Sequence, residues 1–128
     1  MKAKVKSTKS KAEESLKDLI VLGMQDKKAT DIAIIDLRSF KEAIADFFVL
    51  CSGNSDTQVE AIAESVDKMV FKMSGENPRH KEGYATAEWI LLDYVDVIVH
   101  VFKSDKRRHY RLEELWSDAQ IEYIKDLD

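Results

Sequence analysis

The segment CSGNSDTQ, residues 51–58, contains the residue types that can hold a phosphate group. It follows an apolar run and precedes a long helical pattern, and many proteins bind anions at such a turn between strand and helix. Gly53 would allow a left-handed backbone, so that the following N–H groups point at a ligand. The alternative is structural: Ser55 and Gln58 have the S-x-x-Q spacing of a capping box, which satisfies those N–H groups without any ligand.

The sequence favours the cap. A Walker loop requires G-x-x-x-x-G-K-[ST] and a dinucleotide fingerprint requires three spaced glycines, and the chain has neither motif. Asp56, in the first turn of the helix, suits the positive end of the helix dipole but would repel a phosphate. We therefore predict a turn and a helix cap here, and no cofactor site.

The other candidates for chemistry are isolated. Asp93 and Asp96 bracket a predicted tight turn, and a carboxylate pair can hold Mg²⁺. Nucleotide-transferring enzymes usually place two acids at alternate positions of one strand, whereas these two are three apart, so we predict solvated turn acids. The three histidines are scattered, far from the single cysteine and without the spacing of a zinc site. His100 falls on the same strand face as Ile98 and Phe102 and is predicted to be a hydrogen-bonded structural residue.

The composition indicates a globular, soluble chain of 128 residues, of which 45% are hydrophobic and 34% charged. This length suits one domain, and no apolar run is long enough to span a membrane. One cysteine excludes an internal disulfide framework and favours a reducing compartment. The N-terminus lacks both the apolar core of a secretory signal and the arginines of a transit peptide, so we expect a bacterial cytoplasmic protein.

Charge is divided unevenly along the chain. Residues 1–11 carry five lysines and no acid, within a total of 20 basic and 24 acidic side chains. Setting those five aside leaves 15 basic against 24 acidic groups, a net charge of −9 over residues 12–128. We predict a flexible basic tail over 1–11, with contact to nucleic acid as the alternative, and a single domain over 12–128. The acidic domain suits a basic partner surface better than a bare phosphate backbone.

The hydrophobic pattern predicts alternating helices and strands. Apolar residues at steps of three and four indicate helices, and short runs rich in isoleucine and valine indicate strands. In chain order we predict a helix 12–25, strands 32–37 and 46–51, a helix 55–73, strands 87–93 and 96–102 in a hairpin, a turn around DKRRHY, and a helix 111–126. The first two strands are apolar at consecutive positions, so helices should cover both faces. The predicted class is α/β, with a small mixed β-sheet covered by helices.

Three segments together resemble the Iojap family of ribosomal silencing factors. They are DFFVLCSGNSDTQVEAIAE (46–64), EGYATAEWILLDYVDVIVHVF (82–102) and RRHYRLEELW (107–116), and the resemblance extends over about residues 12–118. It implies a nucleotidyltransferase-like fold without the catalytic acids, so that CSGNS would be the relic of a substrate loop in a protein that is not an enzyme. Val95 stands where the family usually has glycine. Because a β-branched residue resists positive φ, we expect a turn that is either longer than two residues or strained.

The resemblance also implies a function. Family members bind the large ribosomal subunit, on the ribosomal protein conventionally numbered fourteen, and block joining with the small subunit when nutrients are scarce. The mechanism would be steric exclusion, which represses translation without chemistry, and a homodimer is a further expectation. Two alternatives stay open: a residual nucleotidyltransferase-type enzyme that uses CSGNS and the acids near 93–96, and a plain dimerisation module.

Trp89 is the expected anchor of partner binding, because large aromatic side chains dominate binding hot spots. The alternative is a core tryptophan. Alternation places Trp89, Leu91 and Asp93 on one face of the strand, with Ile90 and Leu92 on the other. Acids and the neighbouring tyrosine ring are expected to flank the anchor. The expected partner-binding residues are Trp89, Leu91, Asp93, Tyr94, Asp96 and Glu82.

Three further residues follow the last predicted strand. Arg107, Arg108 and Tyr110 are predicted either to reach ribosomal RNA or to brace the last helix. Bracing is favoured for Tyr110.

Overall fold

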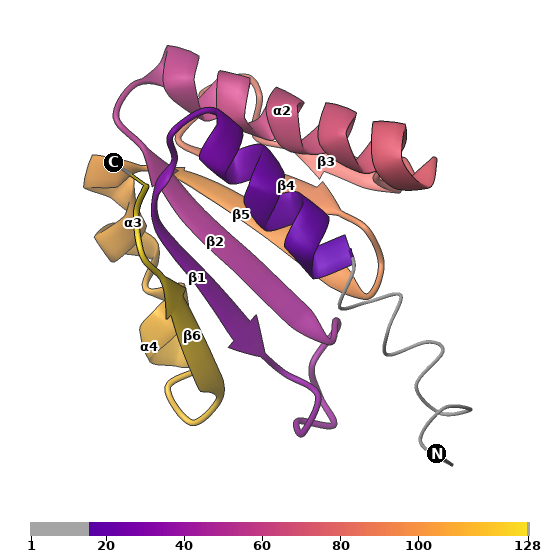
Figure 1. The fold of residues 1–128 in the computed structure, drawn as a ribbon. Helices are drawn as coiled ribbons and strands as arrows, with labels where there is room; N and C mark the ends of the chain where they lie inside the picture. Colours follow the sequence, from indigo (N-terminus) through magenta and orange to yellow (C-terminus); the bar gives the residue numbers. More distant parts are fainter. Residues whose placement is uncertain (1–15, 128) are drawn as a thin grey trace.

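Within residues 16–127, which a computed structural model describes apart from the side chain of His109, the chain forms one six-stranded mixed sheet. The strand order is β3-β4-β5-β2-β1-β6 (Figure 1). The strands are β1 (Thr30–Asp36), β2 (Phe47–Gly53), β3 (His80–Glu82), β4 (Trp89–Asp93), β5 (Val97–Lys103) and β6 (Gln120–Ile124). β2 and β5 run parallel, and the other neighbouring pairs are antiparallel. The predicted α/β class with a small mixed sheet is confirmed.

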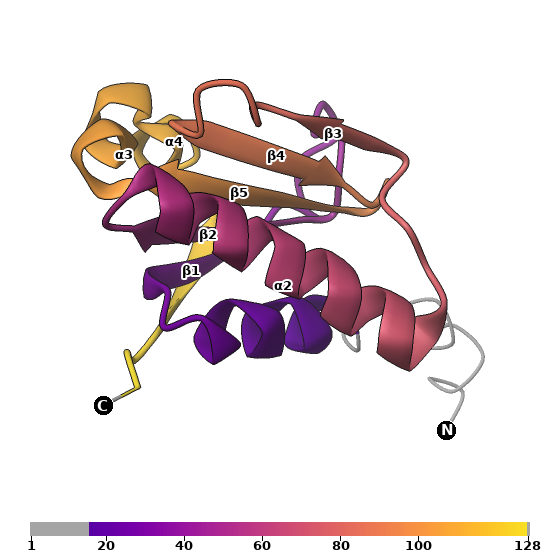
Figure 2. The same cartoon turned by 90° about the horizontal axis from the view of Figure 1, so that it is seen from above.

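Two helices cover one face of the sheet and lie side by side there (Figure 2). They are a helix over residues 16–26 and α2 (Asp56–Ser74). A Cβ atom at Gly23 would lie 2.8 Å from the Cα of Val66, and the Ser65 hydroxyl donates to the Gly23 carbonyl at 2.7 Å. Gly23 therefore lets two helix backbones approach each other closely. Neither this helix nor α2 is long and apolar enough to cross a bilayer, and no other described helix is.

The opposite face is covered by two short helices, α3 (Ser104–Tyr110) and α4 (Leu112–Leu115), and by the connection 37–46. The buried members of this second core are Ile35, Leu37, Ala45, Phe48, Leu50, Ile98 and Phe102. Half-buried aromatic side chains from α3, from the residues after α4 and from β4 pack around them. Both faces of the sheet are thus covered, although long helices lie on only one of them.

The predicted helix 111–126 is wrong. Helix α4 ends at Leu115, and β6 then pairs antiparallel with β1, with Ile121 opposite Ile35. The segment QIEYI alternates its side chains between the two faces, and pairing with β1 decides its conformation against a weak helical pattern. The stretch DKRRHY, predicted as a turn, lies in helix α3. The short strand β3 was also not predicted, because its three residues are polar and exposed.

Two predictions lie partly or wholly outside the described residues. The basic tail 1–11 is entirely outside them, and so are the first four residues of the predicted helix 12–25. The described part of that helix continues one residue further than predicted, to 26.

The turn between β4 and β5 is strained. Val95 has φ +78°, and the Asp96 N–H donates to the Tyr94 carbonyl across this single residue, at 3.0 Å. A three-residue turn with a positive φ at its centre is rare and unfavourable, most of all for a β-branched side chain. Residues 94–96 connect the two strands, so the turn is both longer than two residues and strained, and both alternatives predicted for it are confirmed.

Replacing Val95 with glycine is expected to raise the free energy of unfolding by about 1 kcal/mol, since relief of backbone strain exceeds the extra entropy of glycine in the unfolded chain. The Val95 side chain is 48% exposed, so little apolar burial is lost. Urea unfolding measures the change. Val95→Ala is the control: it keeps a Cβ at positive φ and should gain less than half as much. A glycine variant that unfolds at lower urea than the parent would contradict the assigned strain.

Candidate functional site

The CSGNS turn caps helix α2, largely as the sequence predicts. The Ser55 hydroxyl accepts a hydrogen bond from the Gln58 N–H at 3.1 Å. The Gln58 side-chain oxygen, however, accepts from the Asn54 N–H at 2.6 Å, one residue before the predicted partner. Its amide nitrogen donates to the carbonyl of Lys27 at 3.1 Å. The cap therefore also ties α2 to the turn that follows the first helix.

Gly53 serves packing rather than a left-handed turn. Among the described glycines only Gly75 and Gly83 have positive φ, so the left-handed conformation considered for Gly53 is wrong. A Cβ atom at Gly53 would lie 3.1 Å from the Val59 side chain and 3.2 Å from that of Ile62. The absence of a side chain lets β2 end directly under helix α2.

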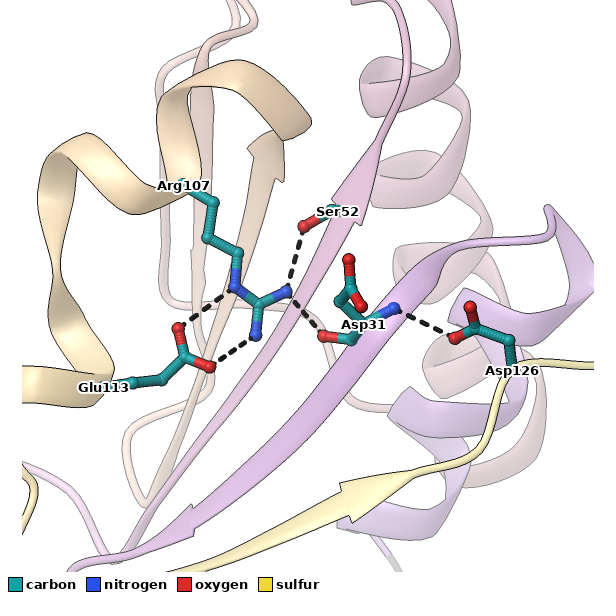
Figure 3. A network of polar contacts seen from close by, with 5 residues as sticks. All are labelled: Asp31, Ser52, Arg107, Glu113 and Asp126. Atoms are coloured by element: carbon teal, nitrogen blue, oxygen red, sulfur yellow. Dashed lines mark hydrogen bonds and ion pairs between the residues drawn. The ribbon is translucent and has the colours of Figure 1, made fainter.

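An arginine lines the hollow beside the carboxyl ends of the parallel strands β2 and β5, where sheets of this kind often bind ligands (Figure 3). Arg107, 11% exposed, makes a bidentate ion pair with Glu113 at 3.1 and 2.9 Å. Its remaining nitrogen donates to the Ser52 hydroxyl at 2.9 Å and to the Asp31 carbonyl. Glu113 thus already compensates the positive charge that a phosphate would need at this position. Arg107 thus braces the C-terminal segment, one of the two roles expected for it.

The described residues contain neither a candidate metal site nor a reactive cysteine. Nowhere between 16 and 127 do three or more histidine, cysteine or acidic side chains meet in a way that could hold a metal ion. Cys51 is fully buried, and burial raises the pKa of its thiol far above the ordinary value, which leaves it without nucleophilic character.

The predicted anchor face is assembled by the register of β3, β4 and β5. Glu82 pairs with Leu91, and Trp89 pairs with Phe102, so their side chains share one face of the sheet. Trp89 and Leu91 are half-buried, whereas the next residues on the strand, Ile90 and Leu92, are fully buried under the helices. The predicted alternation along β4 is confirmed.

Trp89 belongs to an aromatic cluster and is still partly exposed. Its ring lies 4.5 Å from the Tyr110 ring, 5.2 Å from Phe102 and 5.7 Å from His100, measured between centroids. Tyr110 was expected to brace the last predicted helix, and through this contact it instead packs α3 against the sheet. Trp89 therefore combines both alternatives: it packs against core residues, as a core tryptophan does, and it keeps an exposed part that could anchor a partner.

His100 lies beneath Trp89 and is 3% exposed. Its Nδ1 accepts a hydrogen bond from the Trp89 indole N–H at 2.9 Å, so a neutral ring must carry its hydrogen on Nε2. Within the described part of the chain, Nε2 is buried without a hydrogen-bond partner. Burial lowers the pKa of His100 to about 3. The prediction of a hydrogen-bonded structural histidine is confirmed.

The acids around the anchor are not the solvated turn acids that the sequence predicts. Asp93 accepts from Arg79 at 2.7 Å and from the Val95 N–H at 2.7 Å. Burial raises the pKa of Asp93, but these two hydrogen bonds and the nearby positive charge together outweigh it, and the pKa lies below its ordinary value. Glu82 is exposed and bonded to His80. The charge of Asp93 is therefore compensated by Arg79, the residue just before β3.

Two other expected residues lie away from the anchor. Tyr94 is 5% exposed and belongs to the core under the helices, on the opposite face from Trp89, so its ring does not flank the anchor. Asp96 is half-buried in the turn, where its carbonyl accepts from the N–H groups of Asp46 and Phe47. The structure thus brings together Trp89, Leu91, Asp93 and Glu82, and separates Tyr94 from them.

A family model described as "Ribosomal silencing factor during starvation" matches residues 9–128. The chain belongs to this family. A protein named ribosomal silencing factor from Halalkalibacterium halodurans is 43% identical over 106 residues, which cover 83% of this chain and 89% of the relative. A crystal structure from Chromobacterium violaceum, 31% identical, aligns with a TM-score of 0.76 over 81% of this chain and 85% of that one. A mouse protein named "Mitochondrial assembly of ribosomal large subunit protein 1" is 28% identical over 102 residues, 78% of this chain and 44% of its own length.

Membership in the ribosomal silencing factor family confirms the resemblance carried by the three segments, and a regulatory family of this kind gives no support to an enzyme. Two features of the site escaped sequence analysis. The Arg107–Glu113 pair depends on a left-handed residue between α3 and α4, Arg111 at φ +51°, which no local pattern announces. The Trp89–His100 bond had a signal: a hairpin that turns at 94–96 brings both residues to one face of adjacent strands.

The buried histidine makes stability depend on pH. In the folded silencing factor His100 has a pKa of about 3, against an ordinary value of 6.5. As pH falls below 6.5 the unfolded chain takes up the proton first, so the free energy of unfolding should decrease, by about 2 kcal/mol between pH 7.5 and pH 5. Urea unfolding across this range measures the slope. His100→Asn should flatten it, and His80→Gln, at an exposed position, should not; an unchanged slope in His100→Asn would contradict the assignment.

Proposed function

We propose that this chain binds the large ribosomal subunit through the sheet face that carries Trp89 and Leu91, and so blocks joining with the small subunit. It would repress translation in the cytoplasm when nutrients are limiting. The observation that carries the proposal is the family match over residues 9–128, to a family described as acting during starvation. The name of the mouse relative, which refers to the large subunit, supports the choice of subunit.

The proposed contact is the large-subunit ribosomal protein conventionally numbered fourteen. Trp89 and Leu91, both half-buried, offer it a partly exposed apolar surface, and Glu82 lies directly beside Leu91. Because Asp93 is paired with Arg79, we assign its carboxylate the task of holding β3 against β4 rather than direct contact. The net negative charge of the whole domain, rather than Asp93, would then attract the chain to a basic partner surface. This attraction would weaken as the salt concentration increases.

Sedimentation with purified large and small subunits, separately, tests the proposal. The parent chain should pellet with large subunits alone and reduce the joining of the two subunits. Trp89→Ala should bind large subunits at least about thirtyfold more weakly, since anchor residues contribute about 2 kcal/mol or more. Phe71→Ala is the matched control, because this aromatic side chain is 54% exposed on α2, in the helical layer on the other side of the sheet.

Three results would count against this face. The parent chain could fail to pellet with large subunits, Phe71→Ala could lose as much affinity as Trp89→Ala, or Trp89→Ala could bind like the parent. Circular dichroism of each variant checks that it is folded. Light scattering over a range of concentrations tests the further proposal that the chain forms a homodimer.

A further inference from the structure

The indole N–H of Trp89 donates to a single buried acceptor, the His100 side chain. The hydrogen bond from Trp89 Nε1 to His100 Nδ1 measures 2.9 Å and joins neighbouring strands of the β4–β5 hairpin. An indole nitrogen only donates, so this bond uses the one polar group that Trp89 has. The part of the side chain that remains exposed is therefore apolar carbon.

The acceptor itself cannot turn. His100 lies on β5, between β4 and β2, where its ring stacks nearly parallel to Phe102, at 10°, and meets the edge of Phe48 at a centroid distance of 4.6 Å. Its pKa is far below neutral, so the ring stays neutral and Nδ1 remains an acceptor at physiological pH. With the histidine held in place, the hydrogen bond selects one orientation of the Trp89 ring.

Core stability alone does not account for a histidine at this position. Its Nε2 is buried and, within the described residues, has no hydrogen-bond partner, a state that is unfavourable for any polar group. An apolar side chain of similar size would fill the same space between Phe48 and Phe102 without that penalty. The feature that only a polar residue supplies here is the bond to Trp89.

We propose that His100 is a positioning residue for partner binding: it holds the Trp89 indole in one orientation, with the N–H turned into the sheet and the carbon edge presented to an apolar surface of the partner. The inference rests on the proposed function of this face. A side chain that is already immobile loses less conformational freedom when it binds, so the free protein is prepared for the contact. The indole makes no hydrogen bond to the partner.

The test uses two substitutions at position 100 in the full chain. His100→Leu fills the space and removes the acceptor, and His100→Asn places an amide oxygen near the position of Nδ1. Proton–nitrogen NMR spectra report the indole N–H of Trp89 and its exchange with water, with Trp116 as the internal reference, and sedimentation gives the affinity for large subunits. We expect faster indole exchange and about five- to tenfold weaker binding for His100→Leu, with both properties close to the parent in His100→Asn.

The controls separate this inference from the proposed function. If Trp89→Ala loses binding while a folded His100→Leu binds like the parent, the positioning role of His100 is wrong. The proposed binding face around Trp89 is then still supported. If Trp89→Ala binds like the parent, the face itself is wrong. Should His100→Leu fail to fold, His100→Gln replaces it, because its longer side chain carries the acceptor past the indole. Equal affinity of the glutamine and asparagine variants would then overturn the inference.

Discussion

Gly83→Ala is expected to lower the free energy of unfolding by more than about 3 kcal/mol. Gly83 has φ +94°, a conformation that residues with a Cβ avoid. A Cβ atom there would lie 2.0 Å from the carbonyl oxygen of Trp89 and 3.0 Å from the Cα of Ile90. Both atoms belong to the main chain of β4, which is hydrogen-bonded on both sides and cannot move aside.

A second glycine provides the matched control. Gly75 ends helix α2 at φ +77°, with nothing within 4 Å of the position of a Cβ. Gly75→Ala should therefore cost only the conformational strain, about 1 kcal/mol. Urea unfolding of both variants separates strain from collision. Equal losses for the two substitutions would show that the loop before β4 can relax, and that Gly83 is not needed for the approach to Trp89.

The consequence of Gly83→Ala for binding follows from its position. The collision would push the main chain of β4 at the residue that carries the anchor. In the fraction of molecules that stay folded, we expect weaker binding to large subunits, and a shift of the Trp89 indole signal in NMR spectra.

Sequence patterns predicted the elements whose signal is local. Helix α2 repeats its apolar residues at helical steps over five turns, and its start was predicted within one residue because Ser55 and Gln58 form a cap from nearby atoms. The strands β1, β2, β4 and β5 were found from their apolar runs. β6 was not, because QIEYI becomes a strand only when β1 offers an unpaired edge, and that edge exists only in the folded chain.

In the candidate binding face, too, only the features with a local sequence signal were predictable. Alternation along β4 places Trp89 and Leu91 together, and it equally places Tyr94 with Ile90 and Leu92, where the structure has it. The expectation that Tyr94 flanks the anchor followed closeness in sequence instead. The pairing of Asp93 with Arg79 could not be predicted from the sequence. It depends on the register of β3 against β4, and β3 has no hydrophobic pattern of its own.

Arg107→Ala is expected to lower the free energy of unfolding by about 3 kcal/mol. This value is at the lower end of the usual losses for removing one partner of a buried ion pair, because Glu113 keeps some contact with solvent. The substitution leaves the buried Ser52 hydroxyl and the Asp31 carbonyl without their donor. Arg38→Ala is the control: its ion pair with Asp36 is exposed, and it should cost less than about 1 kcal/mol. Urea unfolding compares the two variants.

The position of the Arg107 network in the fold determines where the damage from Arg107→Ala should appear. Arg107 connects α3 to the start of β1 and the end of β2. Asp126 accepts from the Asp31 N–H, in the part of β1 where the pairing with β2 shifts register (Figure 3). Amide exchange should accelerate in β6 and in α3 before it does so in β5. Because Tyr110 on α3 packs on the Trp89 ring, the variant should also bind large subunits more weakly. A uniform increase of exchange over the whole sheet would contradict a local brace, and would make Arg107 part of one cooperative core.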